Sequence, residues 1–160
     1  MPPISAILHT LNDEARLGRA LATLHPCDEI IVVDRGSTDG TLWVARQFGA
    51  VIRTSNPHDS PSAPLESVRN DWVLYLLPSE SLTEGLEASL FEWKLSDASD
   101  VAGIPACSAR IREQASRGWT NGAPSTRLVP TSWQQWDGLL PGYDPRSLLL
   151  QGDLLRFRAP

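Results

Sequence analysis

Asp34 is the first residue whose type and position could support chemistry. It directly follows an apolar run at residues 30–33, and the polar residues Arg35, Gly36 and Ser37 come after it. A carboxylate at the carboxyl end of a buried strand can accept hydrogen bonds from a ribose or a nucleobase. Alternatively, Asp34 accepts hydrogen bonds from the N–H groups of its own turn. Its position alone leaves both interpretations open.

Two other polar loops share this placement. Residues 9–12, with Thr10 and Asn12, and residues 78–80, with Ser79 and Glu80, each follow an apolar run and precede a helical pattern. Ligands of open parallel sheets bind beyond the carboxyl ends of the strands, where the free N–H groups of helix N-termini suit phosphate. The sequence therefore predicts that the three loops converge on a site for a phosphorylated ligand.

Short apolar runs and helical patterns alternate through the first half of the chain, and these elements must position the loops. Strands are predicted at residues 4–8, 29–33, 50–53 and 72–77. Helices are predicted at about 17–24, over 41–48 and after a capping box from Ser81 to Glu84, with a short helical piece at 65–70. Strand–helix repetition with short links is typical of a parallel, doubly wound α/β sheet.

The second half of the chain has a different pattern. Residues 101–113, 118–130 and 133–140 are strand-like, and the apolar tail at 147–155 has no clear assignment. A smaller mixed or antiparallel part is therefore expected here. Trp119, Trp133 and Trp136 fall in this half. They either pack in the core or form an exposed aromatic patch for a partner protein or a glycan.

Length, composition and charge limit the possible functions. The 160 residues fit one domain, and 41% hydrophobic with 21% charged residues is typical of a folded protein. A net charge of −5 argues against a broad nucleic-acid-binding face. Cys27 and Cys107 form no zinc motif. Without a signal-peptide pattern or an apolar run near the ~20 residues of a membrane helix, we expect a soluble, cytoplasmic protein.

Three segments together resemble family 2 glycosyltransferases. Residues 4–14 read ISAILHTLNDE, which is similar to the opening strand and Thr-x-Asn turn of that family. Residues 28–41 read DEIIVVDRGSTDGT and resemble its second signature, commonly Val-Asp-x-Gly-Ser-Thr-Asp-Gly-Thr. Residues 71–76, DWVLYL, resemble the strand that leads into its metal-binding motif. The resemblance covers about residues 3–95 and continues weakly to about 140.

The resemblance implies a GT-A fold and a glycosyltransferase that uses a nucleoside-diphosphate sugar with inversion. It implies one domain over residues 1–160, with a nucleotide-sugar-binding half at 1–95 and a reduced acceptor-side half at 96–160. The residues expected to bind the sugar nucleotide are Thr10, Asn12, Asp34, Arg35, Ser79, Glu80 and Arg127.

The sequence departs from the family at the metal-binding DxD motif. Where the family has Leu-Asp-x-Asp-Glu, this chain has Leu76-Leu77-Pro78-Ser79-Glu80. Mg²⁺ and Mn²⁺ prefer carboxylate oxygens, so at most a weak metal site through Glu80 is expected, and catalysis could be independent of a metal. The alternative is that Glu80 is a solvated residue before a helix.

The remaining catalytic groups are an acid–base residue and cations. Asp137, which follows Trp136, lies near the place where the family carries its base, although it also reads as a turn residue before Gly138. Arg35 together with Arg110, Arg112 or Arg127 could offset the charge of a leaving diphosphate.

Three functions follow from this reading. The first is an active glycosyltransferase that works with or without a metal ion. The second is an inactive relative that binds a nucleotide or sugar nucleotide, or that regulates a partner. The third is a scaffold that keeps only the fold. The sequence does not fix the sugar, the nucleobase, the acceptor or the oligomeric state.

Overall fold

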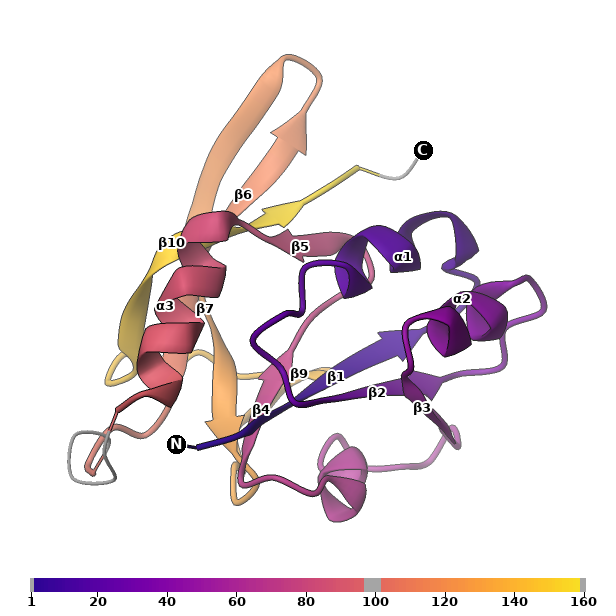
Figure 1. Ribbon diagram of the computed structural model, residues 1–160, viewed down its shortest axis with the longest axis horizontal. Coiled ribbons are helices and arrows are strands. Elements are labelled where there is room, and N and C mark those ends of the chain that lie inside the picture. The colour runs from indigo at the N-terminus through magenta and orange to yellow at the C-terminus, as the bar shows by residue number, and fades with distance from the viewer. Residues whose placement is uncertain (1, 97–101, 159–160) are drawn as a thin grey trace.

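A single eight-stranded sheet forms the framework of the protein. The structure, a computed structural model, describes residues 2–96 and 102–158. The strands lie in the order β3-β2-β1-β4-β7-β6-β10-β5, and a separate two-stranded hairpin is formed by β8 and β9 (Figure 1). The sheet continues without a break from the N-terminal strands into the C-terminal ones, so the two expected halves share one sheet.

The N-terminal part is the parallel α/β unit that the sequence predicts. Strand β1 (Ile4–Thr10) lies between β2 (Glu29–Asp34) and β4 (Trp72–Tyr75), and β3 (Val51–Thr54) is the edge strand. All three pairings among these strands are parallel. Their apolar, β-branched runs are typical of strands covered on both faces.

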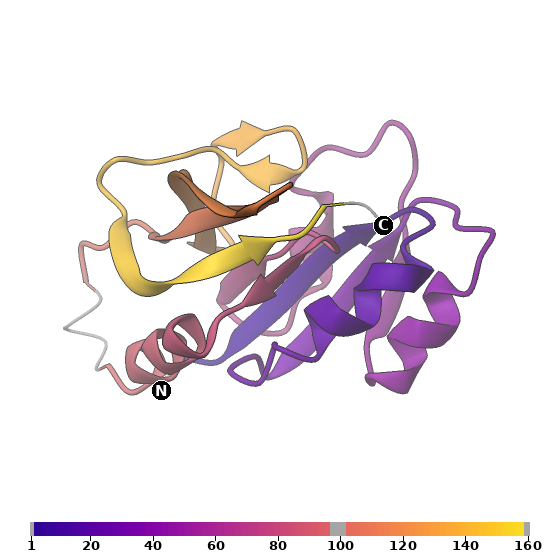
Figure 2. The same ribbon diagram turned by 90° about the horizontal axis from the view of Figure 1, so that it is seen from above.

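Helices cover one face of this parallel unit and a hairpin covers the other. The helices α1 (Glu14–Leu21) and α2 (Thr41–Gln47) pack beside each other. The short strands β8 (Trp136–Asp137) and β9 (Leu140–Pro141) lie across the sheet from them, as Figure 2 shows. Because side chains alternate along a strand, each strand feeds one apolar cluster on each face: Leu8 and Val32 on the helix side, and Ile7, Ile31 and Val33 on the hairpin side.

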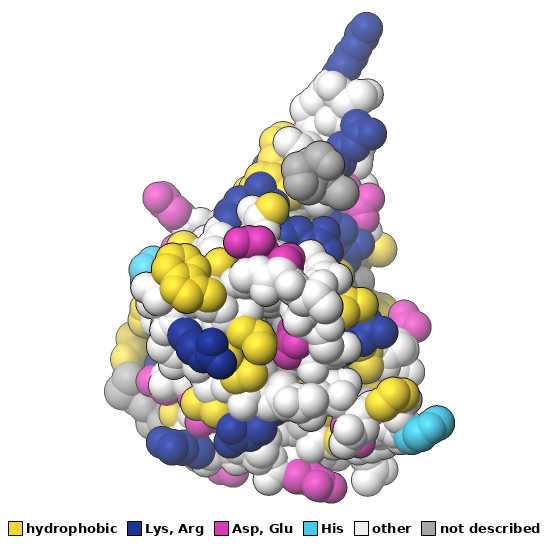
Figure 3. Space-filling model, turned by 90° about the vertical axis from the view of Figure 1, so that its right-hand side faces the viewer, with side chains coloured by type: hydrophobic (Ala, Val, Ile, Leu, Met, Phe, Trp, Pro, Cys, Tyr) yellow, Lys and Arg dark blue, Asp and Glu magenta, His cyan; other side chains and the backbone are white. Residues whose placement is uncertain are grey.

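The C-terminal part extends the sheet with mixed pairing. The long strands β6 (Cys107–Ala115) and β7 (Gly118–Pro130) form a hairpin whose far end projects from the body of the protein (Figures 1 and 3). The tail without a clear assignment is β10 (Leu148–Arg156), which runs parallel to β6. The predicted class, a mostly parallel open sheet flanked by helices with a smaller mixed C-terminal part, is confirmed.

The start of helix α3 differs from the sequence prediction. The helix spans Glu84–Lys94, and its cap is Thr83, whose Oγ1 accepts a hydrogen bond from the Leu86 N–H at 3.3 Å. The predicted cap, Ser81, is buried within β5 (Glu80–Leu82). Strand β5 pairs antiparallel with β10, a partner about seventy residues away in sequence, and this pairing takes Ser81 into the sheet.

Other predictions needed smaller corrections. The helical piece predicted at 65–70 is a 3-10 turn at Ala63–Ser67. The strand predicted at 133–140 is the β8–β9 hairpin. The strand predicted at 101–113 begins at Cys107, and its first predicted residue, 101, lies outside the described residues. Gly152, with φ of 91°, lies where β10 shifts register, and a side chain there would collide with the α3 backbone at Leu86. Among the described residues, no helix is long and apolar enough to cross a membrane.

Candidate functional site

Two adjoining cavities open at the carboxyl ends of the parallel strands. The larger, of about 450 Å³, lies between the ends of β1–β3 and the loop at residues 54–67. The smaller, of about 360 Å³, lies between the start of α1 and the loop at residues 76–79. Figure 3 shows the side of the molecule toward which β1 runs, where Lys and Arg side chains lie among apolar ones. The two cavities lie where a ligand of an open α/β sheet is expected to bind.

One row of side chains across three strands contributes to the larger cavity. His9 of β1 is the register partner of Val33 in β2, and Val33 is the register partner of Arg53 in β3. All three line the larger cavity. Residues two apart along a strand lie on the same face of the sheet, so these three side chains lie on the face of Ile7 and Ile31, opposite the helices. The row therefore places the His9 imidazole and the Arg53 guanidinium near the carboxyl ends of the parallel strands.

His9 and Arg35 line both cavities, so they mark the place where the two meet. Both ring nitrogens of His9 are buried and lack a hydrogen-bond partner among the described residues. Burial, and secondarily the positive charge of Arg35, lower the pKa of His9 to about 4. The imidazole is therefore neutral at neutral pH.

Asp34 is held by its own turn and by Thr10. Its Oδ1 accepts hydrogen bonds from the hydroxyls of Thr10, at 2.7 Å, and Ser37, at 2.6 Å. Its Oδ2 accepts from the N–H groups of Gly36, at 3.0 Å, and Ser37, at 2.8 Å. Burial acts to raise the pKa of Asp34, but the hydrogen bonds from Ser37, Thr10 and Gly36 hold it below its usual value. The turn interpretation thus accounts for both carboxylate oxygens.

Asn12 joins the two loops that follow β1 and β2. Its N–H donates to the Ser37 hydroxyl at 2.9 Å, and its Oδ1 accepts from the Thr38 N–H at 2.8 Å. Asn12 adopts φ of 53°, a left-handed conformation that asparagine tolerates better than most residues. Thr10, Asn12 and Asp34 therefore build the loops, and they are not part of the described lining of either cavity. Direct contact between them and a ligand stays a prediction.

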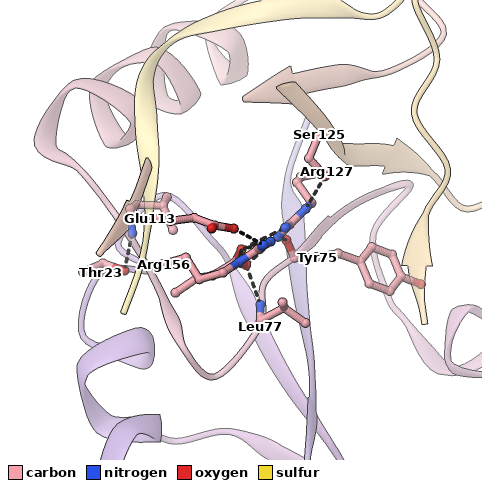
Figure 4. A network of polar contacts seen from close by, with 9 residues as sticks. Thr23, Tyr75, Leu77, Glu113, Ser125, Arg127 and Arg156 are labelled. Carbon is pink, nitrogen blue, oxygen red and sulfur yellow. Dashed lines mark hydrogen bonds and ion pairs between the residues drawn. The ribbon is translucent and has the colours of Figure 1, made fainter. Parts of the chain in front are cut away.

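Glu80 is at the centre of a buried ionic network, shown in Figure 4. Its carboxylate pairs with both terminal nitrogens of Arg127, at 2.6 and 2.9 Å, and with Nε and Nη2 of Arg156, at 3.2 and 2.9 Å. Its Oε1 also accepts from the Leu77 N–H at 2.9 Å. Burial acts to raise the pKa of Glu80, but Arg127, the Leu77 N–H and Arg156 hold it below its usual value.

This network corrects one expectation about Glu80 and shows where Arg127 lies. Glu80 is fully buried, so the interpretation of a solvated residue is wrong. Arg127 is also buried, and its guanidinium donates hydrogen bonds to Glu80, the Ser125 hydroxyl and the Tyr75 carbonyl. Arg127 is not part of the described lining of either cavity, so its contact with a sugar nucleotide stays a prediction. Arg110 and Arg112, on β6, are likewise outside the described linings. Of the four arginines predicted to face the diphosphate, Arg35 is the one that lines the cavities.

The residues at 77–80 do not fit a divalent cation. Leu77 has no side-chain oxygen, Ser79 offers a neutral hydroxyl, and both oxygens of Glu80 already accept hydrogen bonds from the network. No cluster of three His, Cys, Asp or Glu residues occurs within residues 2–96 and 102–158. The weak metal site expected through Glu80 is therefore not formed, because its carboxylate is committed to two arginines.

The smaller cavity combines Ser79 with groups from α1 and β4. Asp13 and Arg16 line it as an ion pair of 2.7 Å. The Tyr75 hydroxyl is buried without a described partner, and burial raises the pKa of this phenol. Ser79 lines the cavity while its carbonyl accepts from the Phe157 N–H at 2.8 Å. The tail thus holds the loop in place.

The β8–β9 hairpin closes the other side of the cavities. Leu139 lines both of them and Leu140 lines the smaller one. Asp137 is exposed on the same hairpin, two residues away, and its role as a base stays a prediction. Trp136 packs edge-on against Tyr75, with ring centroids 5.6 Å apart.

The three tryptophans of the second half do not form an exposed patch. Trp133 is buried and Trp136 packs on Tyr75. Trp119 packs edge-on against Phe157, with centroids 5.3 Å apart. These tryptophans thus pack against the protein itself and do not form the exposed aromatic docking surface considered from the sequence.

Sequence reasoning nominated the loop that contains His9 without naming His9 as a site residue, and it missed Arg53 and Tyr75. The alternation of side chains along each strand could have identified them, because it shows which residues share a face of the sheet. Residues two positions beyond Ile7 and Val51 must share the face of those side chains, whereas Thr10 and Asp34 point to the opposite face.

Part of the chain is similar in sequence to known glycosyltransferases. No known protein-family profile matches it. It is 36% identical over 91 residues to an uncharacterized glycosyltransferase of Rickettsia typhi, covering 54% of this chain and 31% of that protein. It is 46% identical over 46 residues to the lipopolysaccharide core biosynthesis glycosyltransferase LpsC of Rhizobium meliloti, covering 29% of this chain and 17% of that protein. The chain thus spans at most about a third of the length of these relatives.

The fold is also found in a solved glycosyltransferase. A crystal structure of glucosyl-3-phosphoglycerate synthase from Mycobacterium tuberculosis, in complex with Mn²⁺, UDP and glucosyl-3-phosphoglycerate, matches with a TM-score of 0.55 and 23% identity. The match covers 69% of this chain and 44% of that one. The described residues therefore form an α/β fold with a mixed, mostly parallel sheet and three helices, and this fold resembles the GT-A fold.

Proposed function

We propose that this chain carries the donor site of a glycosyltransferase that binds a nucleoside-diphosphate sugar and transfers the sugar to an acceptor. The observation that carries the proposal is the junction of two cavities at His9 and Arg35, at the carboxyl edge of the parallel strands. The larger cavity falls within the 300–1,000 Å³ typical of small-molecule sites. The sequence similarity to glycosyltransferases supports the choice of ligand.

The parts of the ligand are assigned by shape and charge. The nucleoside occupies the larger cavity above the row of His9, Val33 and Arg53. The diphosphate lies at the junction, where the Arg35 guanidinium can donate paired hydrogen bonds to phosphate oxygens. The sugar occupies the smaller cavity beside Ser79. UDP is the nucleotide to test first, because it is the nucleotide bound by the mycobacterial synthase of similar fold.

The transfer step needs a base and a stabilised leaving group. We assign Asp137 as the base that takes the proton from the acceptor hydroxyl. The acceptor oxygen then forms a bond to the anomeric carbon while the bond to the diphosphate breaks, and the nucleoside diphosphate leaves with that electron pair. This single displacement inverts the anomeric configuration. Arg35, at the junction, stabilises the negative charge of the leaving group.

We further propose that transfer does not depend on a metal at residues 77–80. The carboxylates that would hold one are replaced by Leu77 and Ser79, and Glu80 is engaged by Arg127 and Arg156. The same observation favours a second candidate, an inactive relative that binds a sugar nucleotide without turnover. Both candidates share the binding site and differ in chemistry.

One experiment separates the possibilities. The chain is incubated with UDP-, GDP-, CDP- and dTDP-sugars, with Mn²⁺ or with EDTA, while melting temperature and release of free nucleotide are measured. A rise in melting temperature that persists in EDTA, together with nucleotide release, supports a metal-independent transferase. A rise without release in the presence of a varied acceptor mixture supports the inactive relative. The absence of any thermal shift across the panel contradicts both.

A further inference from the structure

We propose that His9 takes up a proton when a nucleoside-diphosphate ligand fills the two cavities, so that the site gains a positive charge only in its bound state. This inference rests on the proposed sugar-nucleotide site. It concerns a residue that the comparison with glycosyltransferases does not single out. Three features carry it: the unpaired imidazole, its place at the junction, and the balance of charges around it.

The first feature is the state of the imidazole in the free protein. Neither ring nitrogen has a hydrogen-bond partner among the described residues, although both are buried. A buried polar atom without a partner is energetically unfavourable, so His9 gains stability from any ligand that supplies a partner. Phosphate oxygens accept hydrogen bonds, and an imidazolium can donate from both nitrogens whereas a neutral imidazole can donate from one.

The second feature is where His9 lies. It lines both cavities, and Arg35, which lines both as well, is exposed at the start of a loop. In a ligand whose nucleoside and sugar occupy one cavity each, the linking diphosphate must pass this junction.

The third feature is the balance of charge around the imidazole. Apart from His9, the charged residues that line the cavities are three arginines and three carboxylates, from the loops after β2 and β3, the strand β3 and the start of α1: Arg16, Arg35, Arg53, Asp13, Asp59 and Glu66. Tyr75 of β4 adds a neutral phenol, because burial raises its pKa. The formal charges cancel, so the diphosphate of a sugar nucleotide would bring two uncompensated negative charges, and a protonated His9 would offset one of them.

The sign of the linkage follows from these features. In the free protein the pKa of His9 lies at about 4, because of burial and Arg35. A phosphate beside the ring raises the pKa in the complex, so protons are taken up on binding at every pH between the two values. Within that interval, each unit of rise in pH weakens binding by up to tenfold.

The test measures proton uptake with a ligand that does not titrate near neutrality. UDP-glucose is suitable because its diphosphate is esterified at both ends; GDP-, CDP- and dTDP-glucose are used in parallel. Calorimetric titrations at pH 6.5 in two buffers of different ionisation enthalpy give the number of protons bound. The expected result is an uptake above zero for the unmodified protein and near zero for His9→Gln.

Matched measurements keep the outcomes distinct. His58→Gln removes an imidazole from the loop beside the larger cavity and should leave the uptake unchanged. Should His9→Gln fail to fold, NMR titration of the His9 ring in the unmodified protein, with and without UDP-glucose, gives the same answer directly. Binding without proton uptake, or with an unchanged His9 titration, overturns this inference alone. No binding by any of the four sugar nucleotides overturns the proposed function and this inference together.

Discussion

The carboxylate of Glu80 and the guanidinium of Arg127 form a bidentate pair, with N–O distances of 2.6 and 2.9 Å, and the same carboxylate accepts a hydrogen bond from the Leu77 N–H in the 76–79 loop (Figure 4). Both side chains are almost completely buried. Bidentate pairing fixes both partners in direction as well as in distance. Arg156 adds a second cation to the same carboxylate. The loop that borders the smaller cavity is therefore held by buried ionic contacts rather than by a bound metal ion.

Glu80→Gln is expected to destabilise the protein strongly. The substitution leaves Arg127 without its countercharge in a buried position, and breaking such a pair typically costs about 3–5 kcal/mol. Urea unfolding gives the free energy. The control is Glu113→Gln, which removes the other partner of Arg156 at a half-exposed position and should cost at most about 1 kcal/mol. Equal losses of unfolding free energy in the two variants would show that the buried pair contributes no more to stability than the half-exposed pair.

The same pair predicts a pH dependence of stability. The pKa of Glu80 in the folded protein lies below its usual value, whereas an unfolded glutamate titrates near 4.3. Its stabilisation is therefore fully present above about pH 4.3 and is lost as the pH falls through the folded pKa. The difference in unfolding free energy between the unmodified protein and Glu80→Gln should be constant from pH 7 to 5 and shrink below pH 4. A constant difference down to pH 3 would contradict this.

Much of the fold follows from local patterns, and the site follows from them only in part. The run at residues 29–33 and the turn from Asp34 to Ser37 correctly predicted a buried strand and its loop. Strand parity was the information not used: Asp34 points to the helix face, and its neighbours Val33 and Arg35 line the larger cavity. One position along a strand changes the face of the sheet.

The Glu80 network lay beyond sequence reasoning for a different reason. Its members come from β5, β7 and β10, and Arg156 is 76 residues from Glu80. No local pattern reports such a long-range pairing, and the tail that supplies Arg156 had no clear assignment. The expectation of a solvated Glu80 reflected the average preference of glutamate for the surface, which a pair of arginines overrides here.

Asp34→Asn tests the scaffold role of the second signature. The carboxylate accepts four hydrogen bonds from Thr10, Gly36 and Ser37, and an amide has one oxygen to accept them. We expect a loss of about 1–3 kcal/mol in unfolding free energy. Retained stability combined with lost nucleotide binding would instead assign Asp34 to direct ligand contact.

Asp137→Asn should separate chemistry from stability. The residue is exposed on the β8–β9 hairpin, so unfolding free energy should change by less than about 0.5 kcal/mol. As the assigned base, its loss should lower the rate of sugar transfer by about 10²–10⁴ while leaving the affinity for the sugar nucleotide unchanged. Unchanged turnover would remove Asp137 from the mechanism.

Arg53→Ala is expected to weaken nucleotide binding by about tenfold, because one charged hydrogen-bond donor to the ligand is lost from the larger cavity. Arg69→Ala is the matched control. It removes the same charge from an exposed position just before β4, at the amino ends of the strands. Calorimetric titration with UDP-glucose should show normal affinity for this variant. Equal losses in the two variants would mean that general charge, not the cavity, governs binding.

The central claim is that a sugar nucleotide binds across the junction at His9 and Arg35 without a metal. The most direct measurement is a ¹H–¹⁵N NMR titration of the protein with UDP-glucose in EDTA. The account predicts that the largest shifts fall on the backbone amides of His9, Val33, Arg35 and Arg53. Shifts confined to residues outside the two cavities, or shifts that develop only after Mn²⁺ replaces EDTA, would contradict it.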